Sequence, residues 1–242
     1  MTRVRIAAGL AVVLLLVAAT TSLALEKTEV PLRDSERSEN WNVATSCTVM
    51  YYNTCTGWLW IWSGWSPGDQ LGIALDSCCP GGTSSVLTGG WLFCWTGSPS
   101  GYGFTGSVDV FAADADLCPT GAPVWTQPYL PVQDWDWLNI AAAVTSPFAV
   151  TYTLSPTAGD PVSVVSDHPA AGPTGPPACG SCYPTTRAVR SFYYGTASSV
   201  ICPGSTFFDG VCDSELMWDF VMECTPTAID PASWGKIKGL YR

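Results

Sequence analysis

The sequence predicts an all-β protein that folds as an antiparallel two-sheet sandwich cross-linked by disulfides. Three observations support this prediction. Short β-rich runs alternate with clusters of glycine, proline, asparagine and aspartate, as in sandwiches and barrels. All eleven cysteines follow residue 46, and the N-terminus has the composition of an export signal. Exported cysteines meet an oxidising compartment, so we expect neighbouring thiols to form disulfides.

The export signal comes first along the chain. Arg3 and Arg5 supply a short positive region, and the apolar run from Ile6 to Ala19 spans 14 residues. A bilayer-spanning helix needs about 20 residues, so this run is too short to span comfortably. Ser22-Leu23-Ala24 is a small-x-small pattern, which predicts cleavage after Ala24 and a signal peptide over residues 1–24. We therefore expect a secreted or cell-surface protein without a transmembrane helix after cleavage, and an uncleaved N-terminal anchor is the alternative.

The charge distribution restricts the partners. Charged residues make up 12% of the chain, and neither lysine nor arginine occurs from Asn40 through Thr186, where nine aspartates lie. A surface without cations cannot neutralise phosphates, so we exclude nucleic acid and disfavour anionic glycans and lipids. Neutral glycans or cell-surface components are the partners that this composition permits. The acidity itself serves solubility or a calcium site.

The domain organisation follows from shifts in composition. Residues 25–40 are charged and poor in apolar side chains, which predicts a solvated leader with at most a turn of helix after Pro31. A single β-sandwich domain is expected over residues 41–227, followed by a tail over residues 228–242. Within the domain, residues 169–186 hold five prolines and three glycines and predict a long irregular loop. A linker between two domains is the alternative.

Ten segments have the residue pattern of strands, with turn residues between them. They are Cys47–Tyr52, Gly57–Trp62, Gln70–Leu75, Gly90–Trp95, Ser107–Ala112, Trp135–Ala142, Phe148–Leu154, Val162–Ser166, Val189–Tyr194 and Met217–Cys224.

The cysteine count is odd, so at least one cysteine is unpaired or bridges to another molecule. Cys47 and Cys55 flank a short turn and can close a hairpin. Cys78 and Cys79 are adjacent, and we expect each to bond a different partner rather than its neighbour. The remaining disulfide candidates are Cys94, Cys118, Cys179, Cys182, Cys202, Cys212 and Cys224.

For two groups of these cysteines the sequence suggests how they are bonded. Cys179 and Cys182 have CxxC spacing inside the proline-rich loop. A disulfide is favoured over a metal half-site there, because zinc requires four ligands. We expect Cys202, Cys212 and Cys224 to connect the last loop to the last strand.

The densest aromatic run is Gly57–Trp65. In a strand, Trp58, Trp60 and Trp62 share one face, whereas Leu59 and Ile61 take the other. A strand with two apolar faces is either buried on both sides or exposes its aromatic face. An exposed row of rings can stack on sugars, whereas tryptophan is buried more often than not. Both interpretations, core strand and binding platform, remain open from the sequence.

Two further runs repeat this alternation. Trp91, Phe93 and Trp95 form one, which we expect to lie beside the first run in the sheet. The other interleaves acids with rings: Asp134, Trp135, Asp136 and Trp137. Carboxylates accept hydrogen bonds from sugar hydroxyls beside a stacked ring, so this run is a second candidate for binding neutral glycans.

Catalytic and metal-binding groups are sparse. His168 is the only histidine, and it precedes the proline-rich loop, a poor position for a preorganised base. A glycosidase needs two facing carboxylates, and acidic pairs occur in every acidic exported protein. We therefore expect no enzymatic activity, with a secreted hydrolase as an alternative. Asp209, Asp213 and Glu215 resemble a calcium loop without the EF-hand order, so a structural calcium ion is the one cofactor considered, against solvated turn acids.

The order of features from Gly106 to Cys224 resembles jelly-roll-like β-sandwich domains of bacterial exported proteins. The matching segments are Gly106-Ser-Val-Asp-Val-Phe-Ala-Ala, a following acidic turn with Cys-Pro-Thr-Gly, Trp137-Leu-Asn-Ile, Phe148-Ala-Val-Thr-Tyr, a strand ending in Asp167, Phe192-Tyr-Tyr-Gly and Trp218-Asp-Phe-Val-Met-Glu. The resemblance covers about half of the chain. It implies a jelly-roll-like fold with a role in binding or adhesion, and it carries no catalytic residues.

The tail is similar to C-terminal tails of predicted exported proteins from little-studied bacteria, which end in a Ser-Trp-Gly-x-Ile-Lys-x-Leu-Tyr-Arg pattern. This similarity implies a sorting or anchoring role carried by Trp234, Lys236, Lys238, Tyr241 and Arg242. The alternative is a short C-terminal helix docked on the sandwich, capped by Asp230 and begun by Pro231. We accordingly expect a secreted or cell-surface, non-catalytic β-sandwich protein with a structural or adhesive role, and a carbohydrate-binding module is the alternative.

Overall fold

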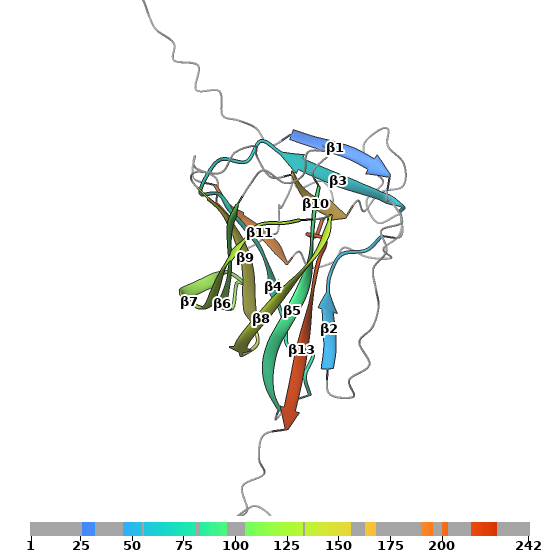
Figure 1. Cartoon of the computed structure of the whole chain (residues 1–242). Coiled ribbons are helices and arrows are strands. Elements are labelled where there is room, and N and C mark those ends of the chain that lie inside the picture. The colour runs from blue at the N-terminus through green and yellow to red at the C-terminus, as the bar shows by residue number, and fades with distance from the viewer. Residues whose placement is uncertain are drawn as a thin grey trace, which may run out of the picture.

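The structure is a computed structural model that describes residues 26–31, 46–54, 56–80, 83–95, 105–132, 134–155, 163–167, 190–195, 200–202 and 214–226. Every regular element within these ranges is a β-strand, and the strands form two sheets with antiparallel pairing throughout (Figure 1). The predicted all-β, two-sheet architecture is therefore confirmed. The described part of the chain contains no apolar helix of membrane-spanning length.

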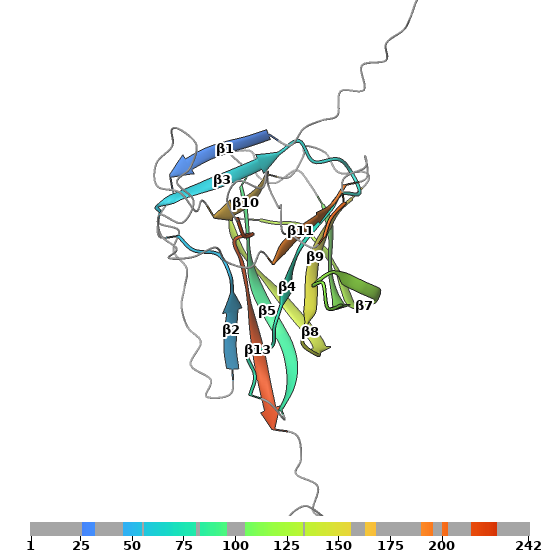
Figure 2. The ribbon, with the colours of Figure 1, turned by 180° about the vertical axis from the view of Figure 1, so that it is seen from behind.

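The first sheet has seven strands. Its order is β1 (Glu26–Pro31), β3 (Trp58–Ser63), β10 (Ser163–Asp167), β5 (Thr83–Trp95), β13 (Trp218–Pro226) and β2 (Ser46–Met50), and β8 (Trp135–Val144) pairs with β5 off this path. Figure 2 shows β1 and β3 crossing above the long strands β5 and β13.

The second sheet has six strands. Its order is β12 (Val200–Ile201), β11 (Ser191–Tyr194), β4 (Gln70–Leu75), β9 (Phe148–Leu154), β6 (Gly106–Ala113) and β7 (Pro119–Tyr129).

Four of the strand pairs are nested along the chain. The β6–β7 hairpin lies inside the pair β5–β8, which lies inside β4–β9, which lies inside β2–β13. These four pairs belong to alternate sheets, and the pair β3–β10, nested between β4–β9 and β2–β13, belongs to the first sheet. The chain thus resembles one long antiparallel ribbon folded over so that its two halves face each other.

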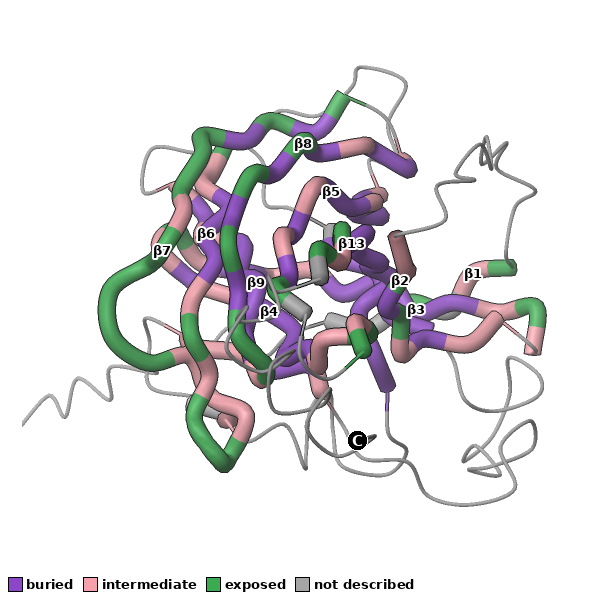
Figure 3. Tube along the Cα trace, turned by 90° about the horizontal axis from the view of Figure 1, so that it is seen from below, coloured by how far each residue is buried: buried purple, intermediate pink, exposed green. Residues whose placement is uncertain are grey.

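The main core fills the space between the sheets. Alternate residues of each strand point inward, as the pleat requires: Leu92 and Trp218 come from the first sheet, and Val108, Val150 and Tyr152 come from the second. In Figure 3 the strands β9 and β13 are largely buried, whereas β7 is largely exposed. Burial of apolar side chains on both facing surfaces is what joins the two sheets.

All ten predicted strands are present, and two of them, β4 and β9, have the predicted bounds. The prediction for β5 was too short, because the strand begins at Thr83 rather than Gly90. Three strands were missed: β1, β7 and β12. Each of them ends a sheet in the strand order.

The missed strands have the composition that edge strands tolerate. Strand β7 contains Pro119, Pro123 and Pro128, which cannot donate to a sheet ladder and are therefore confined to edges and strand ends. Strand β1 corrects the prediction of a solvated leader, since Glu26–Pro31 pairs with β3 along its whole length. Its charged residues match the way natural proteins protect sheet edges from further pairing.

Three disulfides join described residues: Cys47–Cys78, Cys79–Cys224 and Cys118–Cys202. The prediction that Cys78 and Cys79 bond different partners is confirmed. Closure of a hairpin by Cys47 and Cys55 was wrong, because Cys47 bonds Cys78.

The pairing expected within the last third of the chain was also wrong for two of its members. Cys202 follows β12 in the second sheet, whereas Cys224 lies on β13 in the first, so each bonds a cysteine close to its own sheet. Cys94 on β5 is a buried cysteine outside these three disulfides. Cys55, Cys179, Cys182 and Cys212 lie outside the described residues, as do the signal peptide, the loop 169–186 and the tail 228–242.

Candidate ligand-binding face

The outward face of the first sheet carries an aromatic cluster on β5 and β8. Trp91 pairs in register with Trp137, and Phe93 pairs with Trp135. Leu92 and Leu138, the intervening residues, point into the core, so the four rings lie on the opposite face. The result is a cross-strand ladder of aromatic side chains on the outside of the sandwich.

The two outermost rings of this ladder are partly accessible. Trp91 and Trp137 are both half-buried, and their ring centroids lie 5.3 Å apart in an edge-to-face arrangement. The indole Nε1–H of Trp137 donates to Oδ1 of the exposed Asn139 at 2.9 Å. An accessible indole face beside a carboxamide combines an apolar stacking surface with polar groups that can meet hydroxyls.

The buried ring pair Phe93 and Trp135 supports the half-buried pair Trp91 and Trp137. Phe93 and Trp135 are buried and stack with centroids 4.7 Å apart and an interplanar angle of 9°. The ring of Tyr52 lies 6.0 Å from that of Trp135, and its hydroxyl donates to the buried carboxylate of Asp219 at 3.0 Å. Because the supporting rings are packed and hydrogen-bonded, Trp91 and Trp137 lie on a preorganised surface.

The first aromatic run occupies a different environment. Trp60 and Trp62 are 7% and 4% exposed and belong to the core between the sheets. The indole of Trp62 donates to Ser166 Oγ at 2.8 Å, so its polar atom is satisfied inside the protein. Trp58 is half-buried at the strand start. The core interpretation therefore applies to Trp60 and Trp62, which offer no ring face to a ligand.

The prediction that the run Trp91, Phe93 and Trp95 lies beside the first aromatic run in the sheet was wrong. The strand that carries Trp91 and Trp95 is separated from β3 by β10, and its aromatic partner is β8. Strand β5 pairs with β8 through contacts between distant parts of the chain. The alternation of residues within one strand does not indicate which strand will pair with it.

The acids of the second candidate run do not flank a ligand as predicted. Asp136 is buried and points inward, opposite Leu92 in the ladder, toward Tyr129. Burial raises the pKa of Asp136, and the neighbouring Tyr129 hydroxyl opposes that rise only in part. Asp134 is half-buried, and its carbonyl accepts from the Cys94 amide at 2.9 Å. Of this run, Trp137 lies in the half-buried ring pair, whereas Trp135 and Asp136 are buried.

Glu215 has the geometry of a structural acid. It is fully buried, and its two carboxylate oxygens accept from the Arg190 and Ser191 amides at 2.8 Å each and from the Ser191 hydroxyl at 2.6 Å. Asp167 is equally buried and accepts from the Asn53 and Glu215 amides. These acids connect loop backbone to the sandwich. The calcium hypothesis now depends on Asp209 and Asp213, which lie outside the described residues.

A cavity of about 440 Å³ lies beside the disulfides at the end of β5 and β8. Among the residues that the structure describes, its lining includes Ser77, Cys79, Ser85 and Ser146 and no carboxylate. Ser77 and Ser85 share a hydrogen bond of 2.6 Å between their hydroxyls. The lining therefore lacks the facing carboxylates that a glycosidase requires.

Sequence reasoning missed two members of the accessible surface. Trp91 was noted only as part of an alternation, and Asn139 was not singled out. The pattern Trp137-Leu-Asn139 places an indole and a carboxamide on the same face of a strand, which is a usable signal once the outward face is known.

Comparison with protein-family models, with curated proteins and with solved structures finds no match to this chain.

Proposed function

We propose that this chain is an exported, non-catalytic β-sandwich protein that is secreted or held at the cell surface, where it has a structural or adhesive role. The disulfides are the observation on which this proposal depends. Bonds of this kind persist in oxidising compartments and are consistent with an extracellular protein.

The positions of the disulfides suit a protein that must remain folded outside a cell. Cys118 directly precedes β7 and Cys202 directly follows β12, and these two strands end opposite sides of the second sheet. Cys78 and Cys79 connect the β4–β5 segment to β2 and β13. Such long-range cross-links stabilise mainly by restricting the unfolded chain, by about 2–4 kcal/mol each.

We also propose that the sandwich is a jelly roll. The orders β2-β13-β5-β8 in one sheet and β4-β9-β6-β7 in the other support this, as do the four nested pairs. A jelly roll consists of eight strands in two Greek keys, the arrangement that a folded antiparallel ribbon produces. Strands β1, β3 and β10 then extend one sheet, and β11 and β12 extend the other.

Surface localisation tests the role of the tail. Cells that produce the full chain are compared with cells that produce a chain ending at Thr227, and both are fractionated into medium and cell envelope. Loss of envelope retention with export unchanged supports anchoring through Trp234 to Arg242. Equal distribution of both chains would remove the anchoring role and leave a docked C-terminal helix as the interpretation of the tail.

A second candidate function is binding of neutral saccharides, and the pair Trp91 and Trp137 favours it. Their half-buried rings lie beside the carboxamide of Asn139 on a surface supported by stacked aromatic residues. The absence of lysine and arginine from Asn40 to Thr186 argues for an uncharged ligand.

Titration with neutral polysaccharides, followed by tryptophan fluorescence and calorimetry, tests this candidate. We expect Trp137→Ala and Trp91→Ala each to weaken binding by about tenfold, the loss of roughly one good stacking contact. Trp125→Ala is the matched control, because Trp125 is also half-buried but lies on β7 of the other sheet. Equal weakening in all three variants, or no binding by the parent protein, would exclude this surface as a saccharide site.

A further inference from the structure

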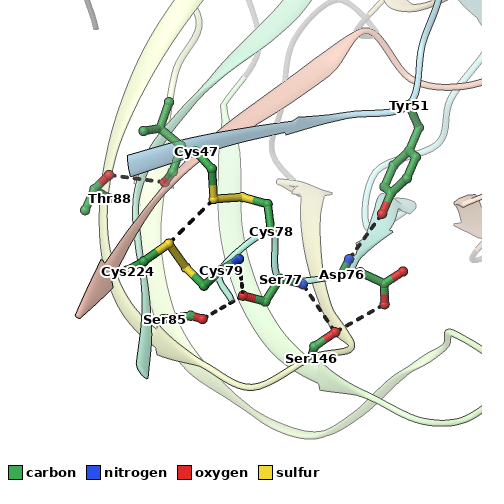
Figure 4. The surroundings of a disulfide bond; sticks show 11 residues. Cys47, Tyr51, Asp76, Ser77, Cys78, Cys79, Ser85, Thr88, Ser146 and Cys224 are labelled. Carbon is green, nitrogen blue, oxygen red and sulfur yellow. Dashed lines mark hydrogen bonds between the residues drawn. A yellow bond between two sulfur atoms is a disulfide. The ribbon is translucent and has the colours of Figure 1, made fainter. Parts of the chain in front are cut away.

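Four cysteine sulfurs lie together where the β4–β5 connection meets the edge of the first sheet (Figure 4). Cys78 bonds Cys47 on β2, and the adjacent Cys79 bonds Cys224 on β13. The Sγ atoms of Cys47 and Cys224, which belong to different disulfides, are only 3.7 Å apart. This is about van der Waals contact, so a Cys47 thiolate released by reduction of its own disulfide would lie next to Cys224 Sγ, the sulfur that it must attack for exchange.

The strands that carry these two sulfurs are neighbours. Strands β2 and β13 pair antiparallel with Cys47 opposite Met222, so Cys224 is the diagonal neighbour of Cys47 on the same face. Diagonal Cα atoms lie about 7–8 Å apart, slightly beyond the usual disulfide range. Both residues are within two positions of a strand end, so a shift of about 1 Å in those ends brings them into that range.

Accessibility differs among the four residues. Cys78 is exposed, whereas Cys47, Cys79 and Cys224 are half-buried. An external thiolate therefore reaches Cys78 first. The connection that carries Cys78 is otherwise fixed by hydrogen bonds: the Cys79 amide donates to Ser77 Oγ at 3.1 Å, and the Ser77 amide donates to Ser146 Oγ at 3.2 Å.

We propose that these cysteines form a thiol–disulfide exchange site whose substrate is an external thiol. The thiolate attacks Cys78 Sγ, the Cys47–Cys78 bond breaks, and Cys47 leaves as a thiolate. Cys47 then attacks Cys224 Sγ, forming Cys47–Cys224 and releasing Cys79 as a thiolate. A second external thiolate attacks the external sulfur of the mixed disulfide, so that an external disulfide forms and Cys78 leaves as a thiolate. Two external thiols are oxidised to one disulfide, and one protein disulfide is reduced to the thiols of Cys78 and Cys79.

The exchange therefore forms a new disulfide, Cys47–Cys224, and does not simply reduce an existing one. The two strands β2 and β13 become covalently joined, and the β4–β5 connection beside the cavity is released with two adjacent thiols. Those thiols are then a point of covalent attachment for another thiol or disulfide.

Limited reduction of the native full-length protein tests the proposal. The protein is treated with less than one equivalent of dithiothreitol, quenched in acid, alkylated with N-ethylmaleimide and digested with pepsin, because trypsin has no site from Asn40 to Thr186. We expect alkylation at Cys78 and Cys79 together with a Cys47–Cys224 cystine peptide. Alkylation at Cys47 and Cys78 with Cys79–Cys224 intact would overturn the proposal, as would native protein that carries one zinc ion on these cysteines.

A variant makes the same test without a reductant. Cys78→Ser leaves the Cys47 thiol beside the Cys79–Cys224 bond, so we expect exchange to Cys47–Cys224 and a reactive thiol mainly at Cys79. Cys118→Ser is the matched control, because it releases the Cys202 thiol, which is not part of the group formed by the sulfurs of Cys47, Cys79 and Cys224. Circular dichroism confirms folding of both variants. A Cys78→Ser protein that is alkylated at Cys47 with Cys79–Cys224 unchanged would contradict the exchange.

Discussion

The run Trp58–Trp62 on β3 and the pair Trp91 and Trp137 on β5 and β8 have similar sequences and opposite environments. Both runs alternate rings with other residues along a strand. Trp60 and Trp62 point into the space between the sheets and are buried, whereas Trp91 and Trp137 point away from it and are half-buried.

The difference shows that alternation identifies the two faces of a strand without saying which face is covered. On β3 both faces are apolar, and the face with Trp60 and Trp62 meets the second sheet. On β8 the face with Leu138 and Ile140 meets the second sheet, so Trp137 is left outside. An aromatic alternation thus predicts a ligand surface only when the opposite face of the same strand already supplies the core.

The largest expected effect is a difference in the loss of folding stability between substitutions of the core tryptophan Trp62 and the surface tryptophan Trp137. Trp62→Ala should lower the free energy of unfolding by about 3–5 kcal/mol, because it empties a buried site and removes the indole N–H that donates to Ser166 Oγ. Trp137→Ala should cost roughly 1 kcal/mol, since its ring is half-exposed and leaves no closed cavity. Urea denaturation measures both, with Trp62→Phe as a milder variant that keeps the fold. Equal losses at both positions would contradict the contrast between core and surface.

A smaller effect tests the contact between β5 and the Trp137 ring. A Cβ on Gly89 would overlap Trp137 Cζ2 and would lie 2.8 Å from the Leu138 carbonyl oxygen. Gly89→Ala should therefore destabilise the protein by about 1–3 kcal/mol. In a Trp137→Ala background the same change should cost less, because one of the two clashes is gone. A double-mutant cycle in urea measures this coupling, and additive losses would show that the ring does not lie over Gly89.

The smallest effect concerns Asp136, which lies between two outward tryptophans and points inward. Burial raises its pKa above the ordinary value of 3.8, so the fold disfavours the ionised form. Its destabilising effect is absent below pH 3.8 and grows as the pH rises through the raised pKa. Asp136→Asn should thus be more favourable relative to the parent at pH 7 than at about pH 4. Denaturation at both pH values decides this, and identical differences at the two would refute the inward placement.

The central strands were predictable because their hydrophobic pattern is a local property. Strands β4 and β9 each pair with two neighbouring strands, and their apolar residues repeat with the period of two that a pleated sheet imposes. The edge strands β1, β7 and β12 were not predictable from that pattern, although the edge strand β2 was predicted. Strand β7 with its prolines and β1 with its charges are stabilised by pairing with one neighbour, which depends on residues far away in the chain.

The candidate surface was predictable only in part. Trp137 was identified from its acidic and aromatic surroundings, but Asp136 next to it turned inward and Trp91 came from a strand more than forty positions earlier. The same holds for the cysteines. Because Cys78 and Cys79 are adjacent, the sequence predicted that they bond different partners. Which partners they bond, Cys47 and Cys224, depends on how β2 and β13 pair.

By itself, the sequence determined the class of fold, the central strands, the depletion of cations and the need for at least one thiol outside the intramolecular disulfides. These properties follow from composition and from short-range periodicity, which are complete in the chain before it folds. Tertiary structure alone decided which face of each aromatic strand is covered, which strands form the edges and which sulfurs meet. Those outcomes depend on contacts between distant segments, and no local pattern encodes the partner of a strand.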